Sequence, residues 1–267
     1  MWIRQAHHNK KRILLIVAIL LLTTSQVQSQ EQEKELGVTF DVTYLSKWLS
    51  KGVEAYGSHG ALFKSIDLDF WGSGFGFEVI HRNAFGSGFV DMERFDYRPY
   101  YKGTVFEDTP YIMNFNVGTE YEHYPRRDRK SANTTWEWIF AFSWPKMLPE
   151  GFTPSYIAHY EYAAGRNYTK QSGADIPSGW VHRFILGYDL KALENAEPLR
   201  LSGELAYTDG LGGAEHDWSY ATFGISTKLK IADNITFLPG VYYQISMEDT
   251  VCDHDVSYTV LSLKYKF

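Results

Sequence analysis

Apolar and polar residues alternate with a period of two along most of the chain after position 30. The segment 111–121 shows the pattern most clearly. Its apolar face carries Tyr111, Met113, Phe115, Val117 and Tyr121, and its polar face carries Asn114, Asn116, Gly118 and Glu120. Successive side chains of a β-strand point to opposite faces, so the alternation predicts strands that have one apolar and one polar side.

Turn signals divide the chain into about 12 predicted strands. They cover residues 36–48, 61–71, 74–83, 91–103, 111–123, 133–144, 155–164, 180–190, 198–208, 217–231, 234–247 and 256–267. The links after even-numbered strands include tight turns at 72–73 and 232–233, whereas those after odd-numbered strands include longer polar stretches at 125–132 and 166–179. An even strand number with short turns on one side favours an all-β fold, a transmembrane antiparallel up-and-down β-barrel.

The character of the two faces separates this barrel from a soluble sandwich. The apolar face concentrates rings on single strands, as at Trp136, Trp138, Phe140, Phe142 and Trp144. Membrane barrels place such aromatic residues in girdles at both interfaces. The opposite face is charged, and a sandwich core would bury those charges only at a large desolvation cost. The polar face is therefore predicted to line a lumen.

Acidic and basic residues are balanced along the predicted lumen. The expected pore-lining residues are Arg94, Asp96, Arg98, Lys102, Glu120, Glu137, Arg183, Arg200, Glu204 and Lys228. Residues 94–102 form the densest group, which is either one wall of a constriction with a transverse field or a ladder of salt bridges between strands. Barrels of eight strands are filled by side chains and those of sixteen or more leave open pores, so both an open and a closed lumen remain alternatives.

The start of the chain predicts export. Basic residues precede an apolar run at 13–22, which is shorter than the ~20 residues of a spanning helix. We expect residues 1–29 to be a secretory signal peptide cleaved after about Ser29, and residues 30–267 to be the barrel. Residues 1–29 hold four basic residues and no acidic one, so the formal net charge changes from −6 to −10 on cleavage. That charge disfavours nucleic acid as a partner.

Three short segments carry a resemblance to a known family. Residues 42–47, 217–222 and 261–267 resemble TorF-type porins, although Lys51 and Gly52 stand where that family has an Arg-Gly pair. The resemblance implies a barrel of the bacterial cell outer membrane that passively admits small polar solutes and has no catalytic residues. The terminal Phe267 resembles the aromatic end recognised by outer-membrane assembly machinery. Lipid, that machinery and small solutes are the expected partners.

Two other functions stay open. One is a closed structural or adhesive barrel, and the other is an outer-membrane hydrolase that uses the His/Asp groups at 216–217 and 253–255. His81, His182 and Ser219 face outward in the predicted register, but their spacing on the strands supports no triad. We expect no enzyme, cofactor or metal.

Three single residues carry minor predictions. Pro99 and Pro239 lie inside predicted strands and indicate bulges or misplaced strand boundaries, because proline donates no ladder hydrogen bond. Cys252 is the only cysteine, which excludes an intramolecular disulfide, and we expect an inert or exposed loop thiol.

Overall fold

A computed structural model describes residues 35–126, 135–163, 178–191 and 197–267. The predicted signal peptide 1–29 and its cleavage point lie outside the described residues, as do parts of the predicted long connections. None of the helices in the described ranges has the length and the apolar character needed to cross a membrane.

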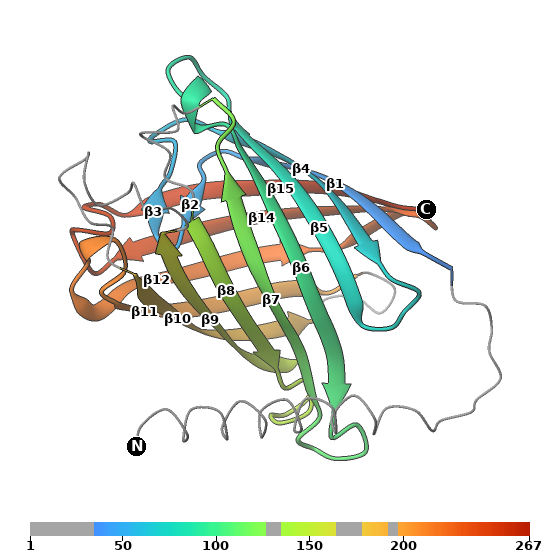
Figure 1. Ribbon diagram of the computed structural model, residues 1–267. Coiled ribbons are helices and arrows are strands. Elements are labelled where there is room, and N and C mark those ends of the chain that lie inside the picture. Colours follow the sequence, from blue (N-terminus) through green and yellow to red (C-terminus); the bar gives the residue numbers. More distant parts are fainter. Residues whose placement is uncertain (1–34, 127–134, 164–177, 192–196) are drawn as a thin grey trace, which may run out of the picture. The chain divides into compact units, whose positions relative to one another are not determined.

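Antiparallel strands form a single wall in which chain neighbours pair throughout (Figure 1). They are β1 (Gly37–Leu45), β4 (Ala61–Asp69), β5 (Phe75–Ala84), β6 (Arg94–Val105), β7 (Met113–His123), β8 (Thr135–Ser143), β9 (Phe152–Ala163), β10 (Gly179–Leu190), β11 (Leu199–Asp209), β12 (His216–Thr227) with its continuation β13 (Leu229–Ala232), β14 (Ile235–Ser246) and β15 (Val256–Lys266). Two short 3-10 turns, η1 (Val90–Met92) and η2 (Leu211–Gly213), lie in the connections. Every predicted strand overlaps an observed one.

The first and last strands close the barrel. β1 pairs with β15 over its length, with Phe40 opposite Tyr265, and the amide of Phe267 donates to the carbonyl of Val38 at 3.0 Å. β14 lies on the other flank of β15, and β12 pairs with β14. Closure leaves no free sheet edge, which is the condition for strands to span a bilayer. The prediction of a 12-stranded antiparallel barrel is confirmed.

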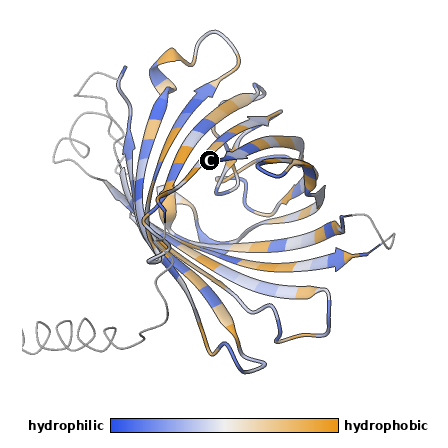
Figure 2. Ribbon diagram, turned by 90° about the vertical axis from the view of Figure 1, so that its right-hand side faces the viewer, coloured by the Kyte–Doolittle hydropathy of each residue, from blue (hydrophilic) through white to orange (hydrophobic). Residues whose placement is uncertain are grey.

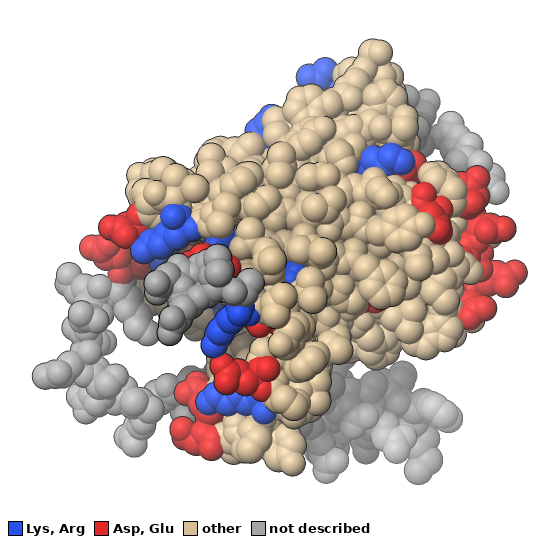
Figure 3. Space-filling view, turned by 180° about the vertical axis from the view of Figure 1, so that it is seen from behind, with Lys and Arg blue, Asp and Glu red and all other residues tan. Residues whose placement is uncertain are grey.

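The two faces of the wall differ as the alternation predicts. Large apolar side chains two residues apart stay exposed on the outside, as at Phe223 (54%) and Ile225 (52%) of β12. Figure 2 shows this alternation as orange and blue bands along the strands. Charged residues gather toward the strand ends in Figure 3 and leave most of the visible wall without charge. A soluble monomer rarely exposes so large an apolar surface, whereas a hydrocarbon layer suits it.

The prolines in the strands break single ladder bonds without moving the register. Pro99 lies opposite Phe77 in β5, and the pairing of β6 with β7 resumes in the same register on both sides of it. Pro239 faces the break between β12 and β13 in the same way. The predicted bulges and misplaced boundaries at these two prolines are wrong. Register shifts do occur elsewhere: Ser219 is an extra residue between β11 and β12, and Ile231 is an extra residue between β13 and β14.

The connection between β1 and β4 folds into the barrel. Within it, β2 (Leu49–Ser50) and β3 (Val53–Glu54) form a two-stranded hairpin with Lys51 and Gly52 at its tip. Both tip residues have positive φ, 51° and 92°, as a two-residue type I′ turn requires. The tip contacts β8, β9 and β14, which lie in different parts of the wall, so the hairpin must lie inside. We call residues 46–60 the inner hairpin. The alternation and turn signals of the sequence did not predict this hairpin.

Candidate functional site

Arginines and carboxylates of β5, β6 and β7 form a dense ion network on the inner face of the barrel. Arg94 Nε lies 2.7 Å from Asp96 Oδ1, and Arg94 Nη1 lies 2.7 Å from Glu122 Oε1. Asp96 also pairs with Arg82 of β5. Asp96 has no exposed surface and Glu122 only 4%, so pairing compensates the loss of hydration that burial imposes.

The rest of the predicted run 94–102 is paired as well. Arg98 bridges Glu120 of β7 and Glu78 of β5, and Lys102 Nζ lies 2.9 Å from Asp69 Oδ2 of β4. All four charged side chains predicted in this run therefore belong to ion pairs, most of which join neighbouring strands. This is the geometry of the salt-bridge ladder, one of the two alternatives that the sequence left open.

The tip of the inner hairpin is held by two carboxylates of the opposite wall. Lys51 Nζ lies 2.7 Å from Glu137 Oε2 of β8 and 2.6 Å from Glu161 Oε2 of β9. These glutamates face each other in register and would repel without a cation between them. Burial by itself lowers the pKa of Lys51, but the two carboxylates outweigh burial, so the pKa of Lys51 lies above its usual value.

Two further contacts fix the inner hairpin to other parts of the wall. The Trp48 ring lies 5.1 Å from the guanidinium carbon of Arg82 and 5.0 Å from that of Arg94, which are cation–π distances. On the far side, Gln244 Nε2 of β14 donates to the carbonyl of Gly52 at 2.9 Å. The inner hairpin thus crosses the barrel interior near the end that carries the connections 85–93, 210–215 and 247–255.

The remaining predicted pore residues are distributed along the other half of the barrel. Arg183 Nε of β10 binds Glu204 Oε1 of β11 at 2.7 Å, and the Tyr220 hydroxyl donates to the same oxygen. Arg200 pairs with Asp189 at 2.9 Å, nearer the end of the barrel where β1 begins and β15 ends. Lys228 is exposed at the break between β12 and β13 and has no ion pair with any described residue.

The two predicted His/Asp groups do not form a shared acid–base site. His216 pairs with Asp209 rather than with Asp217. Asp255 accepts from the Tyr243 hydroxyl and the Ser246 amide, which leaves His254 paired with Asp253 at 2.6 Å. Each group is occupied by its own local contacts, and no contact joins the two groups within the described ranges.

The outward-facing candidates also form no triad. His81 contacts Lys64 and Glu93. His182 shares a hydrogen bond of 2.7 Å with the Tyr156 hydroxyl. Ser219 is fully buried at the bulge, where its hydroxyl accepts from Thr208 and donates to the carbonyl of Ala206. The prediction that Ser219 faces outward is wrong, because the extra residue of the bulge interrupts the alternation.

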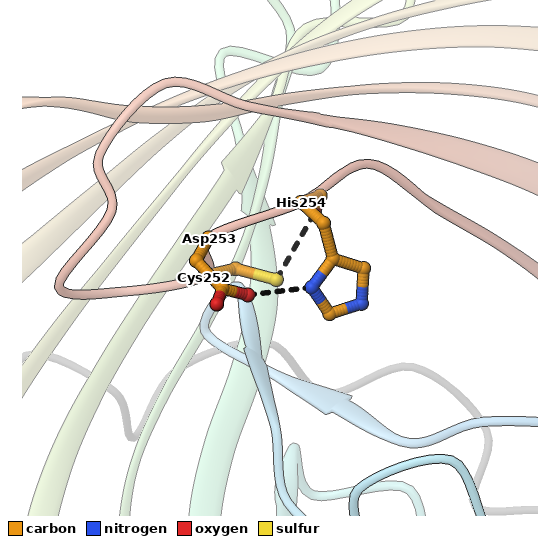
Figure 4. Close-up of side chains that lie close together, drawn as sticks. All are labelled: Cys252, Asp253 and His254. Carbon is orange, nitrogen blue, oxygen red and sulfur yellow. Dashed lines mark hydrogen bonds and ion pairs between the residues drawn. The ribbon is translucent and has the colours of Figure 1, made fainter.

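Cys252, Asp253 and His254 bring metal-ligating residue types together in the connection between β14 and β15 (Figure 4). The thiol is buried and donates to the carbonyl of His254 at 3.2 Å, so of the two expected alternatives, an inert or an exposed thiol, the exposed one is wrong. Asp253 and His254 already bind each other. A second group of acidic residues, at positions 96, 120 and 122, is filled by the guanidinium groups of the ion network.

The closed wall, apolar outer face and charged inner face define the fold of an outer-membrane β-barrel. No protein-family model and no curated protein matches the chain. Solved structures with the same fold include the KdgM porin, at 10% identity and a TM-score of 0.52 over 86% of this chain and 99% of that one. The COG4313 outer membrane channel from Pseudomonas putida F1 matches at 10% identity and a TM-score of 0.52, over 91% of this chain and 100% of that one. Similarity at this identity shows the fold, and membership of the TorF family stays a prediction.

Proposed function

We propose that the protein is a porin-like channel of the bacterial outer membrane that passively admits small polar solutes. The main support is the contrast between an apolar outer wall and an inner face whose charges surround, but do not fill, the interior. The inner hairpin leaves a cavity of about 300 Å³ beside it. The similar solved structures include a porin and an outer membrane channel, which favours transport over other uses of this fold.

In this proposal the inner face that carries the predicted pore residues lines the path, with the fully buried Asp96 behind that lining, and the inner hairpin forms the narrowest part of the path. Paired charges of both signs give a polar lining with little net field, so the channel discriminates by size more than by charge. Export with cleavage after about Ser29, and assembly guided by the exposed terminal Phe267, belong to the same proposal. Enzymatic activity, a cofactor and a resident metal do not.

Single-channel recording tests the proposal directly. The mature barrel, refolded in detergent and added to a planar lipid bilayer, should produce stepwise increases in conductance. Folding is verified separately by the heat-dependent mobility of the barrel in SDS gels. A correctly folded barrel that gives no steps would contradict the channel function.

A closed structural or adhesive barrel is the second candidate. It is favoured by the density of ion pairs on β5, β6 and β7 and by the fixing of the inner hairpin to several parts of the wall. Twelve strands enclose little more than side chains can fill if the hairpin stays fixed. The recording distinguishes the two candidates, because this one predicts a folded barrel without conductance.

A further inference from the structure

The cavity beside the inner hairpin has the features of a built binding site. It measures about 300 Å³ and lies between the hairpin and the wall. The hairpin contributes Trp48, Lys51 and Tyr56, and the wall contributes Glu122, Thr135 and Glu161. Two separate parts of the fold therefore enclose it, unlike a groove on one face.

An unsatisfied hydroxyl lines this cavity. Thr135, the first residue of β8, is 3% exposed, and its Oγ1 has no hydrogen-bond partner among the described residues. Buried polar atoms in native proteins are nearly always hydrogen-bonded, and each exception needs an explanation. A solute hydroxyl in the cavity would supply the missing partner.

The charges in the lining cancel one another. Lys51 lies 2.6 Å from Glu161, and Arg94 lies 2.7 Å from Glu122, so each cation in the lining has a carboxylate beside it. An ionic solute would have to compete with one of these pairs and leave a buried charge uncompensated. A neutral solute with several hydroxyl groups can donate to the carboxylates and accept from the cations without separating them.

Aromatic rings complete the lining. Trp48 and Tyr56 pack edge to face, with centroids 4.8 Å apart, and both line the cavity. The pair contributes a small apolar surface next to the charged groups, since 6% of Trp48 is exposed and Tyr56 is fully buried. Binding sites for small molecules combine such surface with a few placed polar groups, and their volumes begin at ~300 Å³. This cavity therefore suits one ring of a polyhydroxylated compound rather than a long chain.

We propose that the cavity binds a neutral polyhydroxylated solute of monosaccharide size. The inference rests on the proposed channel function, since it names the class of solute that meets the inner hairpin on its way through the barrel. It extends that function from passive admission of polar solutes to a channel that holds one class of them at a defined site.

Glucose binding to the full refolded barrel tests the inference in two ways. Titration calorimetry in detergent should give saturable binding of glucose, and glucose added to a bilayer recording should give concentration-dependent interruptions of the current. The matched acid and amine, glucuronate and glucosamine, should bind more weakly than glucose. Equal or tighter binding of either charged analogue would overturn the neutral solute class.

Thr135→Val removes the hydroxyl and keeps the shape, so it should weaken glucose binding about 2- to 10-fold, as expected for one hydrogen bond. Thr135→Ser keeps the hydroxyl and should bind glucose like the parent protein. Thr153→Val, at the opposite end of the neighbouring strand β9, is the control and should leave binding unchanged. Thr135→Val barrels that fold and bind glucose as the parent does would overturn the site.

The two proposals fail in different ways. Conductance steps that glucose does not interrupt, together with no calorimetric binding, would overturn the cavity site and leave the channel intact. Calorimetric binding by a barrel without conductance would uphold the site and overturn the channel.

Discussion

Individual residues of the wall owe their role to the face they occupy. Val117 and Asn116 are neighbours on β7, yet Val117 lies on the outer, apolar face and Asn116 on the inner, polar face. In a bilayer the first meets hydrocarbon and the second meets the barrel interior. A charged side chain should therefore destabilise the folded barrel by very different amounts at these two positions.

Val117→Arg should destabilise the barrel by about 2–4 kcal/mol, the cost of a basic side chain near the middle of the bilayer. Asn116→Arg is the matched control and should cost far less, because the inner face accommodates charge. Equilibrium unfolding by urea in lipid vesicles measures both. Similar losses at the two positions would show that the assignment of faces is wrong.

His254 provides a test of local electrostatics in the connection between β14 and β15. A hydrogen bond to Asp253 raises the pKa of His254 above its ordinary value, and Glu54 of the inner hairpin, 3.7 Å away, acts in the same direction. The interaction favours the protonated imidazole. Its contribution to the stability of the folded state is therefore complete at low pH and is lost as the pH rises through the raised pKa of His254.

NMR titration of the His254 ring should give a pKa above that of a histidine in an unstructured peptide. Asp253→Asn should move this pKa down, because it removes the charge that favours the imidazolium ion. A His254 pKa that is the same in both proteins would contradict the contact.

At the scale of elements, the inner hairpin decides how much space the barrel leaves. Its tip depends on a tight turn and on the ion pairs of Lys51. A β-carbon at Gly52 would lie 2.5 Å from the Tyr220 ring, and Gly52 has a φ of 92°. Both features require glycine there. Substitutions at Lys51 and Gly52 should therefore displace the hairpin while every residue of the wall stays the same.

Lys51→Met should detach the inner hairpin, because it leaves the buried Glu137 and the partly buried Glu161 opposite each other without a cation. Removing one partner of a buried ion pair costs about 3–5 kcal/mol, so the barrel should also lose stability. Single-channel conductance should rise and become noisier. The triple variant Lys51→Met, Glu137→Gln, Glu161→Gln should regain stability while keeping the higher conductance.

Gly52→Ala is an independent variant that changes no charge and should raise conductance through steric displacement of the turn. Unchanged conductance in both Lys51→Met and Gly52→Ala barrels would show that the inner hairpin does not narrow the conducting path.

At the scale of the whole molecule, one seam determines whether the barrel closes. β15 pairs with β1, so two strands that lie far apart in the chain must come together before the barrel closes. Phe267 ends that strand, with its ring against Tyr265 at 4.6 Å and 75% of its surface exposed. An exposed terminal ring is accessible to other proteins until the barrel has inserted.

Deleting Phe267, or adding a polar tail after it, should reduce the amount of barrel inserted into the outer membrane. Membrane fractionation with the heat-modifiability assay measures the inserted fraction. Phe267→Tyr keeps an aromatic end and should insert like the parent chain. Equal insertion of the deleted and parent chains would show that the end of the chain is not used as a signal.

The predicted wall agrees closely with the structure because its signals are local. Alternation with period two depends only on each strand and its environment, so it marks twelve segments separated by turns without reference to how they pair. The errors are local exceptions to that rule. At Ser219 a bulge adds a residue, and at Pro99 and Pro239 a missing donor leaves the register unchanged.

The candidate site was predictable only in part. Charged residues such as Arg94, Asp96 and Glu120 could be assigned to one face, but their partners could not, because pairing depends on the register between strands. The inner hairpin had a local signal in Lys51 and Gly52, a two-residue turn between short extended segments. That signal predicts a hairpin without indicating whether it points outward or into the barrel.

The sequence by itself determined the class of fold and the polarity of its two faces, since the period of the side chains and the turn residues act over a few positions. Only the tertiary structure decided the register of β1 on β15, the ion pairs of the inner face and the inward path of residues 46–60. These contacts join residues far apart in the chain, such as Gly52 and Gln244, and their distances are set by the curvature of the whole wall. A pattern read along one strand contains no information about that curvature.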